Sequence, residues 1–209
     1  MSRYERRSNM TKKSNSRYKV GTIWNTPKGK IKILDYQMRY KDADGKNHHA
    51  RATIQFLKTG CVRNVQVTNI MAGKINDYRA KTVYGVGYIG SEIKIPERKS
   101  NSIIRRIYDL WANMLKRCYG DYTNNETYRE CSVDVRWHSF TNFLNSIQQV
   151  EGYEYWEQHP HERISLDKDT KIKGSKVYSL DTCRFLTNEE NVREGSFRRW
   201  GKSYEPTLI

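Results

Sequence analysis

The chain has 209 residues, with 38 Lys and Arg against 23 Asp and Glu, which gives a formal net charge of +15 and a sequence pI of about 9.7. A positive excess of this size repels itself within a compact fold and is typical of chains that bind an anionic partner, most often a nucleic acid. No stretch approaches the roughly 18 apolar residues of a membrane-spanning helix, and the first residues lack the apolar core of a secretory signal, so we expect a protein that acts inside a cell and not in a membrane.

The first 19 residues are predicted to be a basic flexible arm. They carry seven cations against the single acid Glu5 and almost no apolar residues. Such a segment buries too little apolar surface to offset its ordering entropy. The arm is expected either to be a solvated tail or to settle on phosphates through cations that include Arg3, Arg6, Arg7, Lys12 and Lys13.

Residues 20–75 are predicted to form a small antiparallel β-barrel of the SH3-like kind. Short apolar runs there are separated by turns that contain glycine, a pattern typical of a small curled sheet. The predicted strands are residues 20–24, 31–36, 49–56 and 62–67. A fold of this kind indicates no function by itself.

Residues 76–101 are predicted to be a connector. Residues 85–90 match the G-x-G-x-x-G pattern of dinucleotide-binding loops, but Pro96 and a Ser-Asn-Ser run separate them from the next predicted helix. A dinucleotide site requires a strand before the pattern and a helix directly after it. We therefore interpret this segment as a lead-in to a second domain at residues 102–200, followed by a tail at 201–209.

The second domain begins with a predicted helix from a cap at Ser102 to about Tyr119. Its apolar residues fall on one stripe, which should face the core. The opposite face carries four cations, and we expect it to be either a solvated surface or a phosphate-contacting surface. These cations are Arg105, Arg106, Lys116 and Arg117.

Further elements follow this helix in the sequence. Residues 133–135 are predicted to be a short strand, and a second apolar-faced helix is predicted from about Ser139. Residues 152–161 are predicted to be a loop rich in aromatic residues. Residues 163–169 then read as a strand that ends in acids, and residues 178–187 contain a second strand.

A helix is predicted to start directly after the second of these strands. Thr187 and Glu190 have the spacing of a capping box, which places the start of the helix at Asn188. The order is thus strand, loop, strand, helix. This order puts Asp167 near the end of the first strand and Asn191 on the first turn of the helix.

A family resemblance is carried by several motifs that follow one another in order. They are Trp111-x-x-Met114-x-x-Arg117-Cys118-Tyr119, Val135-x-Trp137-x-x-Phe140-x-x-Phe143, Leu166-Asp-Lys-Asp169, Tyr178-Ser179, Cys183-x-Phe185 and Glu190-Asn191. Together they resemble a group of bacteriophage proteins similar to HNH homing endonucleases, over about residues 83–196. The preceding β segment also resembles modules attached to such proteins.

The resemblance implies an α+β protein with a ββα-metal domain that nicks DNA in the cytoplasm of a bacterial host. In that family one divalent cation, commonly Mg²⁺ and here Mg²⁺ or Mn²⁺, is held by a residue of the first strand and a residue of the helix, which correspond to Asp167 and Asn191. Such a cation stabilises charge on the phosphate and on the leaving oxygen. Asp169 is expected either to replace Asp167 as ligand or to cap the loop. Arg184 and Arg193 either hold the scissile phosphate or are ordinary surface residues.

Two positions depart from the family pattern. Lys168 stands where the family has a His general base, and a lysine at its usual pKa of about 10.4 is protonated and cannot accept a proton from water. Thr182 stands where the family has a supporting Asn. His159 and His161, just upstream of the strand, either substitute as base or ligand or are surface residues of a loop.

The four cysteines show no short paired spacing. They are expected to be buried thiols of a reducing compartment rather than ligands of a zinc site built from Cys118, Cys131 and Cys183.

The sequence therefore predicts a protein that binds duplex DNA and cuts it at a metal site. Three alternatives stay open: a catalytically inactive DNA-binding regulator, an RNA- or ribosome-binding accessory protein, and a protein that binds a host protein.

Overall fold

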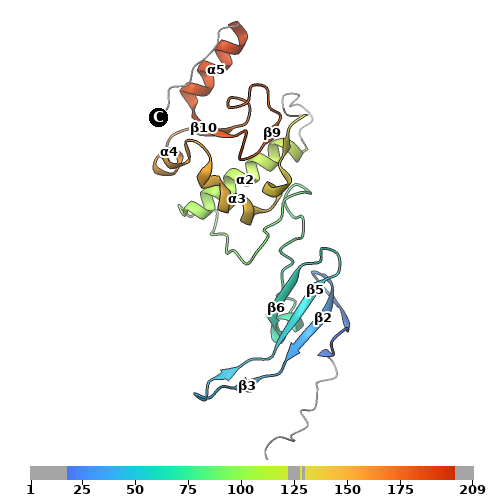
Figure 1. Ribbon diagram of the computed structural model, residues 1–209. Helices are drawn as coiled ribbons and strands as arrows, with labels where there is room; N and C mark the ends of the chain where they lie inside the picture. The colour runs from blue at the N-terminus through green and yellow to red at the C-terminus, as the bar shows by residue number, and fades with distance from the viewer. Residues whose placement is uncertain (1–17, 122–127, 129, 201–209) are drawn as a thin grey trace, which may run out of the picture. The chain divides into compact units, whose positions relative to one another are not determined.

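The computed structural model describes residues 18–121, 128 and 130–200 (Figure 1). The chain divides into two compact units, residues 1–77 and residues 78–209. The cations expected to act from the N-terminal arm lie outside the described residues: Arg3, Arg6, Arg7, Lys12 and Lys13.

The first unit is an open antiparallel sheet in the strand order β1-β2-β5-β6. Its strands are β1 (Ile23–Thr26), β2 (Gly29–Gln37), β5 (Arg51–Phe56) and β6 (Val62–Gln66). In the described part of the unit β1 and β6 do not pair with each other, so the SH3-like barrel expected from the sequence is not closed. The physical reason lies after β6, where the chain turns directly into α1 (Val67–Met71) and forms no closing strand.

One face of this sheet is buried, and the period-2 pattern of the sequence decides which one. Ala52, Ile54 and Phe56 alternate with half-buried residues along β5, and Ile31 and Ile33 lie beside them on β2. All five side chains are almost fully buried. Alternation of this kind gives one apolar and one solvated face.

A small hairpin continues β2 and β5 beyond the sheet, and its two short strands lie outside the strands predicted from the sequence. It is made of β3 (Tyr40–Lys41) and β4 (Asn47–His48), which pair antiparallel and extend away from the main sheet (Figure 1). Its turn contains Gly45 at a φ of 80°, which a side chain would disfavour.

The core of the second unit is built by helices. They are α2 (Ile103–Tyr119), the 3₁₀ helix η3 (Val135–His138), α3 (Phe140–Ser146), the 3₁₀ helix η4 (Ile147–Gln149) and α4 (Tyr153–Gln158). The predicted apolar stripe of α2 is confirmed, since Ile107, Trp111, Met114 and Leu115 are buried. The indole Nε1 of Trp111 donates to the carbonyl oxygen of Trp137 at 2.7 Å.

The segment that was expected to be a connector is packed into the second unit. A Cβ on Gly87 would lie 2.5 Å from Cδ1 of Leu115, so the backbone there sits directly on α2. The amide of Tyr88 donates to the carbonyl of His138, and the carbonyl of Tyr88 accepts from the amide of Phe140. Residues 78–101 therefore belong to the folded second unit.

Short strands and a last helix complete the second unit. β7 (Ser132–Val133) pairs parallel with β9 (Val177–Tyr178), β8 (Ile164–Asp167) pairs antiparallel with β10 (Arg184–Thr187), and α5 (Asn188–Trp200) follows β10. The predicted α+β class is thus confirmed. No helix within the described ranges combines the length and the apolar character needed to cross a lipid bilayer.

The predicted capping box at the start of α5 is also confirmed. The amide of Thr187 donates to Oε2 of Glu190 at 2.9 Å, and the amide of Glu190 donates to Oγ1 of Thr187 at 3.3 Å. These two bonds satisfy donors that the first turn of a helix leaves open, which is why the chain turns from strand to helix at Asn188.

Candidate metal centre

Three carboxylates converge where β8, its following loop and α5 meet. Asp167 ends β8, Asp169 lies two residues later in the loop, and Glu194 projects from α5. One oxygen of each lies within 4.8 Å of the other two, and all three residues are half-buried. Within the part of the chain that the structure describes, this is the one group of three or more potential metal ligands. We call it the acidic group.

Local hydrogen bonds hold the carboxylate of Asp167 in place. Its Oδ2 accepts from the amide of Asp169 at 3.0 Å and from the amide of Thr170 at 2.8 Å, and the hydroxyl of Thr170 donates to the same oxygen. The second oxygen, Oδ1, takes part in none of the hydrogen bonds found among the described residues. Asp167 therefore caps the loop with one oxygen and can offer the other to a ligand.

The donor set of the acidic group fits a hard divalent cation. Carboxylate oxygens are the ligands that Mg²⁺, Mn²⁺ and Ca²⁺ prefer, whereas Zn²⁺ sites are usually built with His and Cys. Three carboxylates brought together also repel one another, and a bound cation would remove that repulsion. Asp167, Asp169 and Glu194 are the residues that would hold it.

The sequence placed the helix ligand at Asn191, one turn before the residue that the acidic group contains. Asn191 lies on the first turn of α5, as predicted, and is exposed. Glu194 is three residues further on, so the two side chains share one side of the helix. Sequence reasoning missed Glu194, although a carboxylate at this spacing from Asn191 was the available signal.

Lys168, which the resemblance placed at the position of a general base, is buried. Its side chain is 9% exposed, and Nζ lies 4.0 Å from Oδ2 of Asp169. Nζ also lies 5.4 Å from the ring centroid of Tyr178 and 5.6 Å from that of Tyr128. The position is thus filled by a side chain packed between two aromatic rings and an acid.

The residues considered as helpers of the base have structural contacts. Thr182 Oγ1 donates to the carbonyl of Val177 at 2.6 Å and accepts from the amide of Ser179 at 3.1 Å, so it shapes the turn between β9 and β10. The ring of His159 stacks on Tyr155 with centroids 3.9 Å apart. His161 is exposed, and neither histidine belongs to the acidic group.

Arg184 is buried beside the acidic group. It is the Cα partner of Asp167 in the β8–β10 register, and its side chain is 8% exposed. Nη1 lies 3.7 Å from Oε1 of Glu151, and Nε has no hydrogen-bond partner among the described residues. A buried guanidinium with so few partners is unusual, because each buried donor left open costs free energy.

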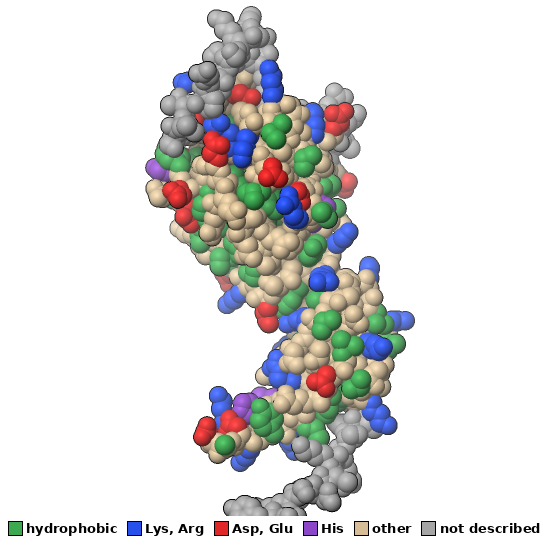
Figure 2. Space-filling view, viewed as in Figure 1, with side chains coloured by type: hydrophobic (Ala, Val, Ile, Leu, Met, Phe, Trp, Pro, Cys, Tyr) green, Lys and Arg blue, Asp and Glu red, His purple; other side chains and the backbone are tan. Residues whose placement is uncertain are grey.

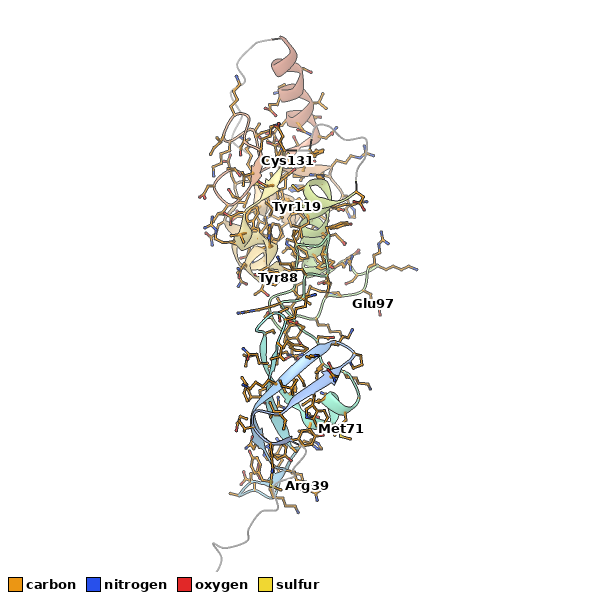
Figure 3. The ribbon with its side chains drawn as sticks, turned by 90° about the vertical axis from the view of Figure 1, so that its right-hand side faces the viewer. Arg39, Met71, Tyr88, Glu97, Tyr119 and Cys131 are labelled. Carbon is orange, nitrogen blue, oxygen red and sulfur yellow. The ribbon has the colours of Figure 1, made fainter. Side chains whose placement is uncertain are left out.

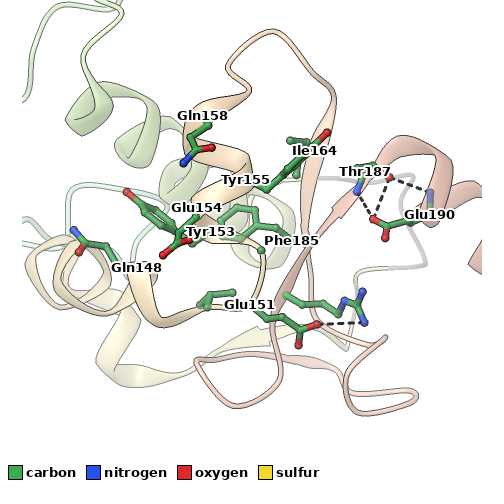
Figure 4. A pocket seen from close by; sticks show the side chains of 13 residues that line it. Gln148, Glu151, Tyr153, Glu154, Tyr155, Gln158, Ile164, Phe185, Thr187 and Glu190 are labelled. Carbon is green, nitrogen blue, oxygen red and sulfur yellow. Dashed lines mark hydrogen bonds and ion pairs between the residues drawn. The ribbon is translucent and has the colours of Figure 1, made fainter. Parts of the chain in front are cut away.

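A pocket of about 400 Å³ opens next to Arg184 (Figure 4). It is bounded by α4, by β10 and by the first turn of α5. Three acids line it with Arg184, namely Glu151, Glu154 and Glu190, while Asp167 does not. The pocket and the acidic group are therefore separate features that Arg184 adjoins.

The cations expected on the outer face of α2 make contacts within the unit. Arg105 pairs with Asp109, with Nε 2.9 Å from Oδ2. Arg106 donates to the backbone carbonyls of Trp156 at 2.6 Å and Glu157 at 2.8 Å, and its guanidinium lies 4.4 Å from the Trp156 ring centroid.

The remaining predicted cations are exposed. Lys116 and Arg117 lie in the last turn of α2, with Arg117 within electrostatic reach of Tyr178, and Arg193 lies on α5. The structure therefore gives Arg105 and Arg106 a role in holding the unit together. Lys116, Arg117 and Arg193 are exposed, and Arg117 also interacts with the side chain of Tyr178.

The cysteines of the second unit are thiols rather than a ligand cluster. Cys131 and Cys183 are buried and Cys118 is half-buried, and none of the three is in a disulfide. Burial raises the pKa of Cys118 and that of Cys183 to about 12 in each case, so both carry their protons at neutral pH.

Comparisons with known proteins return nothing for this chain. No protein-family model matches it, and no curated protein and no solved structure gives a significant match.

Proposed function

We propose that this protein binds duplex DNA and, with a divalent cation at the acidic group, hydrolyses a phosphodiester bond to leave a nick. One observation carries the proposal: a strand pair, β8–β10, leads directly into α5, and carboxylates from the strand end, the loop and the helix lie within 4.8 Å of one another. The ββα-metal family, which the sequence motifs resemble, has the same order of elements. The net charge of +15 supports an anionic polymer as the substrate.

The chemistry divides between the cation and the chain. A divalent cation would supply charge stabilisation at the phosphate and the leaving oxygen. The chain fixes Asp167 through the Thr170 bonds and places Arg184 opposite Asp167 in the β8–β10 pair. Mg²⁺ or Mn²⁺ is the cation that this oxygen donor set favours.

One observation favours a second candidate function, a DNA-binding protein that does not cut. Lys168 fills the position of the general base and is buried between two tyrosine rings, where it has no bulk water to act on. In that case the acidic group is a retained scaffold, and binding is the whole function.

A plasmid-nicking assay separates the two functions. Supercoiled plasmid is incubated with Mg²⁺ or Mn²⁺ and with wild type, Asp167→Asn, Glu194→Gln or the control Glu189→Gln, which alters an exposed acid of α5 outside the acidic group. Loss of a residue that merely supports a metal ligand costs about 10- to 100-fold, so loss of a ligand should cost at least that. We expect nicking by wild type and the control, and a loss of about 100-fold or more in the other two.

Binding is measured in parallel by anisotropy with duplex DNA, single strands and structured RNA. Tight salt-dependent binding of duplex DNA without nicking by wild type would select the second function. Nicking that survives in both Asp167→Asn and Glu194→Gln would remove the acidic group from the proposal, and preference for RNA would remove DNA as the partner.

A further inference from the structure

The positive charge of this protein is concentrated in its first unit. Residues 1–77 hold 17 Lys and Arg against 5 Asp and Glu, a net charge of +12, whereas residues 78–209 hold 21 against 18, a net charge of +3. The face of the first unit seen in Figure 2 accordingly shows many basic and few acidic side chains. Since phosphate contacts come mainly from Lys and Arg, the first unit is where a nucleic acid should be held.

Within the first unit the hairpin of β3 and β4, residues 38–50, stands out by its shape. It continues the β2–β5 pair, which ends at Gln37 opposite Arg51, as a two-stranded ribbon with the register Tyr40 opposite His48. Arg39 lies in this hairpin, well apart from Met71 on α1 (Figure 3). A ribbon that leaves its sheet buries little surface against it, so it needs a stabilising device of its own.

That device is a set of contacts among the hairpin's own side chains. The rings of Tyr40 and His48 stack with centroids 4.5 Å apart and planes 7° from parallel. Nε2 of His48 lies 2.8 Å from Oδ2 of Asp42, whose Oδ1 accepts from the amides of Asp44 and Lys46. The ribbon is therefore ordered before any partner arrives, which lowers the entropy cost of binding.

The ribbon carries three cations that form no ion pair with any described acid. Arg39, Lys41 and Lys46 are exposed, and among the described residues none of them is in an ion pair. Of the two acids in the ribbon, Asp42 is engaged by His48 and by the turn, and Asp44 is exposed in the turn. The cations on the flanks are thus available to phosphate oxygens.

The length and width of the ribbon fit the major groove of B-DNA. From Gln37 to the turn at residue 43 the chain rises about 3.4 Å per residue, or about 20 Å in all. The major groove of B-DNA is about 12 Å wide and about 8.5 Å deep and admits a two-stranded ribbon, whereas the major groove of duplex RNA is too narrow for side chains to read. The ribbon is long enough to reach the floor of the DNA groove while its base stays at the phosphates.

We infer that residues 38–50 insert into the major groove of duplex DNA, with Arg39, Lys41 and Lys46 on the groove edges and the phosphates. The inference rests on the proposed function for its ligand, and it moves the main DNA contact from the outer face of α2 to the first unit. The second unit, with its net charge of +3, then contributes the acidic group rather than most of the affinity.

The test is a salt titration of duplex binding by the full chain without added divalent cation. One variant carries Arg39→Gln, Lys41→Gln and Lys46→Gln. The matched control carries Lys28→Gln, Lys58→Gln and Lys74→Gln, which removes the same charge from exposed lysines at the opposite end of the sheet, where the β1–β2 turn, the β5–β6 turn and the end of α1 lie. Each lost phosphate contact makes the negative slope of log affinity against log salt shallower by about 0.9. The slope of the ribbon variant should therefore be shallower by about 2.7, and the control should keep the wild-type slope.

Dimethyl sulfate footprinting gives the second readout, because guanine N7 lies in the major groove. Wild type and the control should protect N7 positions, and the ribbon variant should not. Equal slopes for the ribbon variant and the control, or bound wild type without N7 protection, would overturn the inference. Nicking that depends on Asp167 would then still leave the proposed function standing, whereas a wild type that binds no duplex DNA would overturn both.

Discussion

Asp167 and Arg184 face each other as directly opposed residues of the antiparallel β8–β10 pair. Opposed residues send their side chains to the same face of the pair, so Asp167, the strand residue of the acidic group, lies opposite the buried Arg184. Arg184 reaches from there to Glu151 at 3.7 Å and so links the strand pair to the segment that precedes α4.

Arg184→Ala should therefore destabilise the second unit more than Glu151→Gln does. The alanine variant removes a buried stem together with the ion pair, for a loss of about 2–3 kcal/mol in the free energy of unfolding. The carboxylate of Glu151 is 41% exposed, so its neutralisation should cost under about 1 kcal/mol. Denaturant unfolding followed by tryptophan fluorescence compares the two, and equal losses would contradict the buried position of Arg184.

The capping box predicts a link between helix stability and metal affinity. Thr187→Ala removes a side-chain acceptor of the first turn of α5 and should cost about 1 kcal/mol. Glu194 lies on the same helix, so the Mn²⁺ affinity of Thr187→Ala, measured by calorimetry, should be lower than that of wild type. Thr170→Val removes the hydroxyl that donates to Asp167 in the loop after β8. This variant should also bind Mn²⁺ more weakly, but without any loss of helix content.

Arg106 should prove to be a structural residue and not a phosphate contact. It donates to two carbonyls near the C-terminal end of α4, a position where a cation stabilises a helix. Arg106→Lys keeps the charge but loses the two-pronged geometry, and should cost about 1–2 kcal/mol of stability while leaving DNA affinity unchanged. A drop in DNA affinity without a drop in thermal stability would return Arg106 to the binding surface.

Two glycines should respond to alanine in opposite directions. A Cβ at Gly87 would lie 2.5 Å from Leu115 and 3.0 Å from Trp111, so Gly87→Ala should destabilise the second unit by about 1–3 kcal/mol. Gly195 in α5 has nothing within 4 Å of such a Cβ, and Gly195→Ala should stabilise by about 0.5–1 kcal/mol. Thermal unfolding of the two variants measures both, and tolerance of alanine at residue 87 would mean that residues 78–101 are a connector after all.

The second unit should lose stability at alkaline pH through Cys183. Burial raises the pKa of this thiol from 9.0 to about 12, so the unfolded chain releases the proton first and stability falls between these two values. The loss reaches about 1.4 kcal/mol per pH unit for one such group. The free energy of unfolding, measured at pH 8, 9, 10 and 11, should therefore fall more steeply with pH for wild type than for Cys183→Ala. The thiol should also resist alkylation at pH 8.5 until the chain unfolds.

Long periodic elements could be predicted from the sequence, and short ones could not. The stripe from Ile107 to Leu115 and the Thr187–Glu190 spacing each specify a helix locally, and both were confirmed. The six-residue α4 was expected to be a loop. Its two buried residues, Tyr153 and Trp156, are too few to show a helical period, and the helix is stabilised by their burial in the core.

The candidate site shows the same division. The position of Asp167 at the end of its strand follows from the local pattern, whereas the approach of Glu194 depends on how α5 packs on the strand pair. The burial of Lys168 likewise depends on rings from other segments, Tyr128 before β7 and Tyr178 on β9. No local pattern reports either contact.

The core of the second unit is closed by residues that come late in the chain. Leu166, Tyr178, Cys183 and Phe185 pack in one cluster with Trp111 of α2. During synthesis, the apolar stripe of α2 therefore stays uncovered until the residues up to Phe185 have been made. The core of the first unit, in contrast, is complete once Ile75 has emerged. Because domains tend to fold in the order of their synthesis, the first unit should be folded while the unit with the acidic group is still exposed to chaperones and proteases.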